Sequence, residues 1–128
     1  MSDQLRFLLT LSSALGCGLI AGVFFAFSAF VMKALSRISP THGITAMQSI
    51  NIVVINPWFM AAFFGTGLGC LVLAVSSLSA WHRPGTAYAV AGSLLYLLGT
   101  ILVTMVCNVP RNNALAAVDP GSTEGARL

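Results

Sequence analysis

Amide and hydroxyl side chains gather at two places in a chain that has few other polar groups. The asparagines among them are Asn51, Asn108 and Asn112. Their polar or charged neighbours are His42, Gln48, Thr104 and Arg111. Amide N–H groups can hold a phenol, an enolate or a carbonyl by hydrogen bonds, and a guanidinium group can offset developing negative charge. These residues form the candidate site. In the structural alternative, the asparagines cap helices, Pro110 ends a helix and Arg111 anchors at lipid headgroups.

Carboxylates are almost absent, which excludes several kinds of chemistry. The only acidic residues are Asp3, Asp119 and Glu124. The long region between Asp3 and Asp119 therefore has no paired carboxylates for acid–base work, no carboxylate-bridged metal centre and no acid that would drive a proton pump. The net charge of +3 comes from basic residues scattered around apolar segments. That pattern indicates membrane topology signals and no nucleic-acid partner.

Metal, haem and nucleophile chemistry also lack the residues they need. The histidines, His42 and His82, are expected on opposite sides of a membrane, so we expect no metal site. Haem is the alternative, with His42 or Met47 as its single axial ligand. No serine or cysteine stands with a convincing base, and no G-x-S-x-G, P-loop or dinucleotide motif occurs. Three cysteines without CxxC spacing are expected to be small buried apolar residues: Cys17, Cys70 and Cys107.

Apolar segments long enough to cross a membrane occupy most of the chain. Charged residues make up 7% of the sequence, and the mean hydropathy is +0.91. A bilayer core of about 30 Å needs about 20 apolar residues in a helix. The sequence thus predicts an all-α transmembrane bundle in one membrane domain, with spans over 7–32, 57–79 and 86–109. Three spans place the termini on opposite sides, and the expected location is the plasma (inner) membrane.

The connections between the spans carry their own signals. Residues 42–55 keep helical apolar spacing broken by amides, which predicts an amphipathic helix that is interfacial or re-entrant. Asn56 and Pro57 match a helix cap followed by proline in the first turn, so the second span begins there. Residues 114–128 contain a Pro-Gly-Ser break and are expected to be a flexible tail.

Small residues at four-residue intervals predict close helix packing in lipid. In the first span they are Ala14, Gly18, Gly22 and Ala26. In the second span they are Ala61, Gly65 and Gly69. The third span instead carries a band that turns about 40° per step on an ideal helix. It contains Gly92, Tyr96, Thr100, Thr104 and Asn108. Its polar groups should face other helices, because lipid cannot satisfy them.

Four segments together resemble the anthrone oxygenase-like family of small membrane proteins. They are Ala21-Gly22-Val23-Phe24-Phe25-Ala26-Phe27-Ser28, Ala46-Met47-Gln48-Ser49-Ile50-Asn51, Asn56-Pro57-Trp58-Phe59, and Asn108-Val109-Pro110-Arg111-Asn112 with Ala114-Leu115-Ala116. The resemblance implies a helical membrane protein that oxidises an anthrone to an anthraquinone with molecular oxygen and no bound cofactor. It also implies that Asn51, Asn108 and Asn112 orient the substrate and stabilise its anion, with His42 as the base.

The chain departs from the family pattern in ways that suggest partners. Lys33 stands where the family usually has proline, and Arg111 where it usually has an aliphatic residue. The family also continues into a fourth crossing, so we expect a homo-oligomer or a partner helix to supply the missing wall. The expected ligand is a small aromatic or lipophilic molecule within the lipid bilayer. The alternative function is a non-catalytic membrane protein that binds a lipophile or packs with a partner subunit.

Overall fold

Helices joined by short connections make up the chain. A computed structural model describes residues 1–122, and no strand occurs in that range. The elements in order are α1 (Asp3–Ala26), η1 (Phe27–Val31), α2 (Met32–Ser36), α3 (Pro40–Val53), α4 (Pro57–Ser77), α5 (Thr86–Leu94), η2 (Leu95–Leu102), η3 (Thr104–Asn108) and α6 (Val109–Ala116). The η elements are π-helical, with wider turns than an α-helix.

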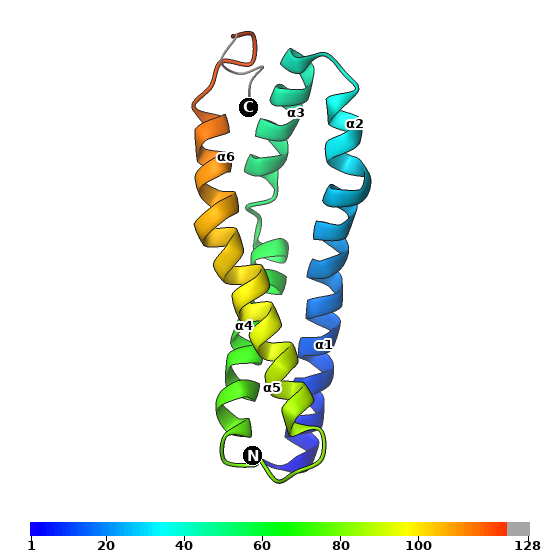
Figure 1. The fold of residues 1–128 in the computed structure, drawn as a ribbon, viewed down its shortest axis with the longest axis vertical. Coiled ribbons are helices and arrows are strands. Elements are labelled where there is room, and N and C mark those ends of the chain that lie inside the picture. Colours follow the sequence, from blue (N-terminus) through cyan, green and yellow to red (C-terminus); the bar gives the residue numbers. More distant parts are fainter. Residues whose placement is uncertain (123–128) are drawn as a thin grey trace.

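These elements form three rods, of which the second runs antiparallel to the first and the third (Figure 1). The first rod is the continuous helix Asp3–Ser36, and the third is Thr86–Ala116. The second rod consists of α3 and α4, one after the other, with a non-helical break over residues 54–56 between them. The start of α1 and the end of α6 lie at opposite ends of the bundle, and the location of the termini on opposite sides of a membrane stays a prediction. We call these two ends of the bundle the N-terminal end, which includes the α4–α5 connection, and the C-terminal end.

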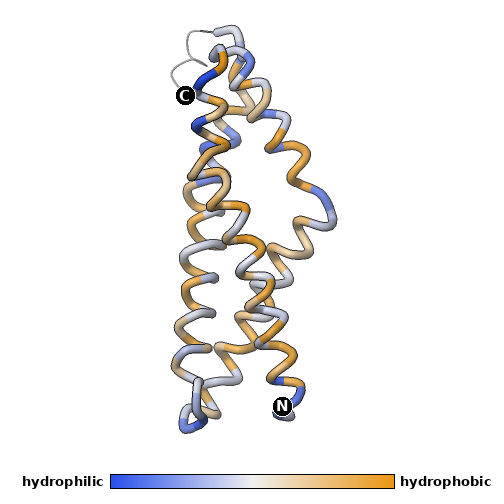
Figure 2. The backbone as a smooth tube through the Cα atoms, turned by 90° about the vertical axis from the view of Figure 1, so that its right-hand side faces the viewer, coloured by the Kyte–Doolittle hydropathy of each residue, from blue (hydrophilic) through white to orange (hydrophobic). Residues whose placement is uncertain are grey.

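Length and hydropathy make this a helical membrane protein. Within residues 1–122, three helices are long and apolar enough to cross a bilayer: Asp3–Ser36, Pro57–Ser77 and Thr86–Ala116. At 1.5 Å per residue, the first rod is about 50 Å long, which exceeds the roughly 30 Å hydrocarbon core. Hydrophilic residues gather mainly towards the two ends of the bundle (Figure 2). The all-α prediction is confirmed.

Side-chain caps begin α3 and α4 where the connections allow them. The Phe59 N–H donates to Asn56 Oδ1 at 3.0 Å, and Pro57 occupies the first turn. This confirms the predicted start of the second span. The helix predicted over 42–55 is α3, which begins at Pro40 with Ser39 as its cap. α3 runs along the bundle axis (Figure 1), so it does not lie flat as an interfacial helix would. The re-entrant alternative stays a prediction.

The third rod continues beyond its predicted end. A span ending at Val109 was expected, but the helix continues to Ala116, so residues 114–116 are not tail. Pro110 lies in the first turn of α6, directly after the wide turns of η3. A proline within a helix cannot donate to the carbonyl four residues earlier and clashes with it, and a wide turn relieves both problems. The rest of the predicted tail, residues 123–128, lies outside the described residues.

A small buried core joins the rods in the half of the bundle nearer the N-terminal end. Its members are Ile20, Phe63, Cys70 and Tyr96. α1 and α5 both pack on α4 there. The Tyr96 hydroxyl donates to the Phe63 carbonyl oxygen at 2.8 Å. Because lipid offers no partner, this bond satisfies the phenol inside the bundle.

The close approach of α1 and α4 does not use the predicted small-residue stripe of the first span. Gly18 and Gly22 have open space where a side chain would point, within the described part of the chain. A methyl group on Gly16 would instead overlap the Thr66 side chain, and one on Gly69 would press on Ser13. The four-residue spacing was real, but it marks a face turned away from α4.

Candidate functional site

Gln48 ties α3 to the last turn of α6 at the C-terminal end. Its Nε2 donates to the carbonyl oxygens of Leu115 and Val118, both at 2.9 Å. The Leu115 carbonyl oxygen also accepts from the Val118 N–H at 3.1 Å, and Val118 lies just beyond α6, so Gln48 adds a side-chain donor where the regular helical bonds end. Both amide hydrogens are used, and only the side-chain oxygen remains as an acceptor. In the structure the Gln48 amide nitrogen connects α3 to the C-terminal part of the third rod and the residues after it, and its predicted role in substrate binding stays a prediction.

Asn51 lies one turn further along α3, on the same face as Gln48. Its side chain is half-buried, and Nδ2 is buried without a hydrogen-bond partner in residues 1–122. α3 and α6 run in opposite directions. A step of three residues from Gln48 to Asn51 therefore corresponds to a step back from Leu115 to Asn112. Helical rise places Asn51 and Asn112 at about the same level of the bundle.

The polar band of the third rod keeps to the inside of the bundle. Tyr96 is buried, and the next members at four-residue intervals are half-buried: Thr100, Thr104, Asn108 and Asn112. Leu102, Met105 and Val106 between them are exposed. On an α-helix the band would drift by about 40° per step. Since π turns hold more residues each, η2 and η3 oppose this drift and hold the band inward.

Thr104 carries a hydroxyl group without a partner. Its Oγ1 is buried and makes no hydrogen bond within residues 1–122. Elsewhere in the chain, Thr10 and Thr45 donate to the carbonyl oxygen four residues earlier, at 2.8 Å each. That local bond is the usual outcome for a helical threonine. Thr104 therefore differs from two comparable residues in the same protein.

Asn108 does not act as a helix cap. It precedes α6, but its backbone is already helical, with φ −77° and ψ −45°, and its side chain makes no capping bond. An N-cap residue normally has an extended backbone and accepts a bond from the helix. The capping interpretation from the sequence therefore does not describe Asn108. We call Asn51, Thr104, Asn108 and Asn112 the amide cluster.

The structure does not bring His42 to the amide cluster. His42 is exposed in the first turn of α3, and its backbone N–H donates to Ser39 Oγ. Nine residues separate His42 from Asn51, which corresponds to about 13 Å along the helix and about 180° around it. Arg111 is also exposed, and its predicted role beside the substrate stays a prediction.

Of three comparisons with known proteins, one bears on the family. The sequence profile described as anthrone oxygenase matches residues 58–127, more than half of the chain. This chain belongs to the anthrone oxygenase family. Neither a curated protein nor a solved structure matches it significantly.

The family match covers one side of the amide cluster. It extends from the first turn of α4 through α6, and so includes Thr104, Asn108 and Asn112. Asn51 and Gln48 precede it. The matched region therefore contains the three cluster residues on the third rod. The fourth, Asn51, lies on α3 outside the matched region.

The cavities of this anthrone oxygenase family member lie beside the cluster or far from it. One of about 330 Å³ opens at the α3–α4 break and is lined by Ser49, Ile50, Val53, Val54 and Asn56. A larger one of about 530 Å³ lies at the N-terminal end. Neither contains a member of the amide cluster, which is packed between helices.

Within residues 1–122, no group of three or more histidines, cysteines and carboxylates could hold a metal ion. The expectation that no cofactor is needed stays a prediction. Cys17 and Cys70 meet inside the bundle, with their Sγ atoms 3.8 Å apart, a contact that was not predicted. They lie on different rods and 53 positions apart, so no local spacing signals the contact. Cys107 was expected to be buried, and it is exposed.

Proposed function

We propose that this protein binds a polycyclic phenolic substrate against the amide cluster and promotes its cofactor-independent oxygenation, as from an anthrone to an anthraquinone. Family membership supports the reaction class. The observation that carries the proposal is that the two buried side-chain polar atoms without a partner in residues 1–122, Asn51 Nδ2 and Thr104 Oγ1, both lie in the cluster. Leaving such a group unsatisfied costs about 1–3 kcal/mol, so natural proteins rarely do so without a function.

The amide cluster suits a substrate with oxygen atoms on a rigid aromatic frame. Thr104 and Asn112 are eight residues apart, or about 12 Å along the third rod. An amide N–H and a threonine O–H can both donate to a phenolate or enolate oxygen. Donors fixed in a dry site stabilise such an anion far more than water-exposed donors, because the surroundings have a low dielectric constant.

The reaction needs no further reagent besides oxygen. Loss of a proton from the doubly benzylic carbon gives an anion delocalised onto the ring oxygen. This anion passes one electron to O₂, and the resulting radical pair forms the C–O bond. The peroxide takes up a proton and then loses water, which leaves the second carbonyl group. One anthrone and one O₂ thus give one anthraquinone and one water.

The protein contributes anion stabilisation, and the proton passes to water. His42 faces away from the cluster, and Asp119, the carboxylate closest to Asn112 along the described part of the chain, is exposed and accepts a bond from the Gly121 N–H. A catalyst that stabilises the anion lowers the barrier to its formation without a dedicated base. This replaces the role for His42 that the family resemblance implied.

The test measures quinone formation by the purified protein in detergent, with an anthrone under oxygen. We expect Asn51→Ala, Asn108→Ala and Asn112→Ala each to lower kcat/KM by about a hundredfold to a thousandfold, the range for the loss of one anion donor. Asn113→Ala is the matched control, since Asn113 is the exposed neighbour of Asn112. Equal turnover by all four variants and the unchanged protein would exclude this site. Saturable binding without turnover above the uncatalysed rate would identify a lipophile-binding protein instead.

A further inference from the structure

The larger cavity lies at the end of the bundle opposite the amide cluster. Its volume is about 530 Å³, and it lies between the first turns of α1 and the connection that leads into α5. Charged side chains line it: Asp3, Arg6 and Arg83. Two guanidinium groups and one carboxylate leave it with a net charge of +1. The proposed oxygenation does not use this cavity.

Hydrogen bonds hold both arginines at the cavity and leave most of their donors open. Arg6 Nη2 donates to Ser77 Oγ at 2.7 Å, and Ser77 is fully buried on α4. Arg83 Nη1 pairs with Asp3 Oδ1 at 2.5 Å. A guanidinium group has five N–H donors in a planar fork that matches phosphate oxygens. Each arginine thus keeps N–H groups available after its observed bond.

The Asp3–Arg83 pair is exposed and therefore exchangeable. The Asp3 side chain is 86% exposed and that of Arg83 45%. Exposed ion pairs contribute little net stability, so an incoming anion can replace the carboxylate at small cost. α5 also begins at this cavity, and Gly85 before it has φ 80° and gives no side-chain cap. The open N–H groups of this first turn add positive potential, while the arginines carry the binding.

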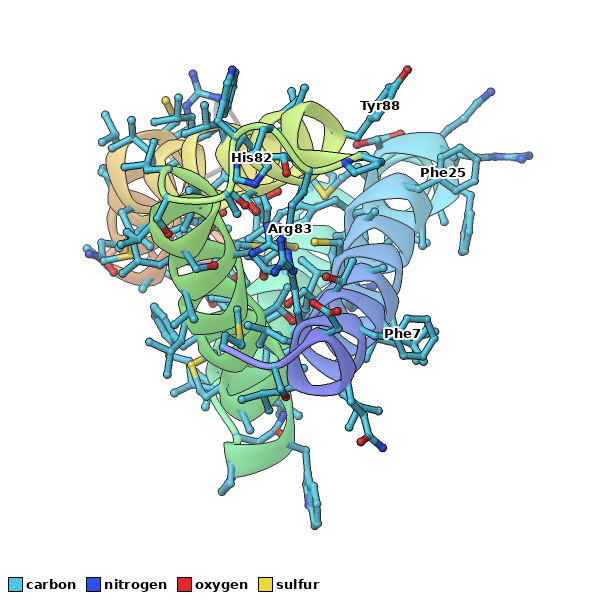
Figure 3. All side chains as sticks on the ribbon, turned by 90° about the horizontal axis from the view of Figure 1, so that it is seen from below. Phe7, Phe25, His82, Arg83 and Tyr88 are labelled. Carbon is cyan, nitrogen blue, oxygen red and sulfur yellow. The ribbon has the colours of Figure 1, made fainter. Side chains whose placement is uncertain are left out.

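Aromatic side chains around the cavity place it at the level of lipid headgroups. Trp81 is 61% exposed and Tyr88 85% exposed. Viewed along the bundle from this end, Arg83 lies among the helix ends, while Phe7 and Tyr88 point outwards (Figure 3). Tryptophan and tyrosine concentrate where the hydrocarbon core meets the headgroups. A cationic cavity at this depth faces the phosphate groups of the surrounding lipid.

We propose that this cavity binds a phosphate group through Arg6 and Arg83, with the Asp3 carboxylate displaced. The phosphate comes from the headgroup of an anionic phospholipid or from free phosphate, which the two guanidinium groups recognise by the same bonds. In the lipid case, Phe7 lies beside the acyl chains. The bound phosphate then connects α1 to the α4–α5 connection in place of the Asp3–Arg83 pair.

The experiment measures dissociation constants for the detergent-solubilised full chain by native mass spectrometry. The probes are phosphatidylglycerol, phosphatidylcholine and inorganic phosphate. We expect Arg6→Gln and Arg83→Gln each to weaken phosphatidylglycerol binding by about tenfold or more, since each removes charge-assisted hydrogen bonds. Arg37→Gln is the matched control, because Arg37 is exposed at the other end of the bundle. Phosphatidylcholine should bind more weakly, because its choline offsets the phosphate charge.

A variant that gains affinity separates binding from a structural role. Asp3→Asn removes the competing carboxylate and frees Arg83, so phosphatidylglycerol should bind severalfold more tightly, although this variant loses an ion pair. Arginine-dependent binding of inorganic phosphate would assign the free anion as the source. The proposal is overturned by equal affinity for the two lipids, by arginine variants that bind like Arg37→Gln, or by weaker binding in Asp3→Asn. None of these outcomes depends on quinone formation.

Discussion

At the scale of single residues, Thr104 and Asn51 are positions where the proposed binding site lowers the stability of the folded protein without ligand. Each buries a polar atom that has no partner in residues 1–122. A buried donor without a partner destabilises the folded protein, whereas a ligand oxygen that accepts from it recovers the loss. Stability of the empty protein and affinity for the substrate should therefore respond in opposite directions to changes at these residues.

Thr104→Val tests this opposition. It removes the unpartnered hydroxyl and keeps the branched shape, so we expect the free energy of unfolding to rise by about 1 kcal/mol. The affinity for an anthrone should fall, because one donor is lost. Unfolding in detergent and equilibrium binding measure the two effects. Thr45→Val is the control: its hydroxyl is exposed and bonded to the Thr41 carbonyl oxygen, so substrate affinity should stay unchanged. A Thr104→Val protein with lower stability and unchanged affinity would contradict the argument.

The sequence identified the residues of the amide cluster but not what each one does. Asn51 and Thr104 stood out because amides and hydroxyls are rare in apolar segments, which is a local property of the chain. Gln48 stood out for the same reason, yet its partners are backbone carbonyls of residues Leu115 and Val118 on another rod. His42 was placed near them by membrane side alone. His42 and Asn51 lie nine residues apart on α3, and this spacing turns His42 to the opposite side of the helix.

At the scale of elements, wide turns decide how the third rod presents its side chains. Helical length and apolar character were predictable, because they depend on residue types within one segment. The π-helical elements η2 and η3 were not predictable: no local signal marks η2, whereas Pro110 directly follows η3, where a wide turn accommodates it. For the same reason the sequence placed the end of this helix at Val109 rather than at Ala116. The polar band itself was correctly expected to face other helices.

Gln48→Leu tests the connection between α3 and α6. It removes two hydrogen bonds and leaves the Leu115 and Val118 carbonyl oxygens without that donor. At about 1 kcal/mol per bond, we expect a loss of about 2 kcal/mol in unfolding free energy. Amide hydrogen exchange should rise in α6 first, because the change acts locally. Gln4→Leu, at an exposed position of α1, should leave exchange in α6 unchanged. A uniform loss of protection from hydrogen exchange along the whole chain would contradict a local connection between α3 and α6.

At the scale of the whole molecule, the α1–α4 contact determines how the rods assemble. Lipid gives no hydrophobic driving force between helices, so small residues that permit close approach and internal hydrogen bonds carry the association. Gly16 and Gly69 fill this role, whereas Gly18 and Gly22 face away from the other rods. Sequence spacing could not choose between these faces, because both repeat at helical intervals. The choice depends on the partner helix and on which of its side chains, such as Thr66, occupies the contact.

Gly16→Ala and Gly18→Ala form a matched pair that tests which face of α1 packs. Both changes raise helix propensity, by roughly 0.5–1 kcal/mol. At Gly16 the added methyl group overlaps the Thr66 side chain, which is buried against α1, and overpacking of this kind costs about 1–3 kcal/mol. Thermal unfolding in detergent should therefore show Gly16→Ala as less stable than the unchanged protein and Gly18→Ala as equal or more stable. The double variant Gly16→Ala/Thr66→Ala should recover part of the loss, because it removes the overlapping group. The reverse order of stability would place the helix contact on the Gly18 and Gly22 face, and the buried core of Ile20, Phe63, Cys70 and Tyr96 would then need another explanation.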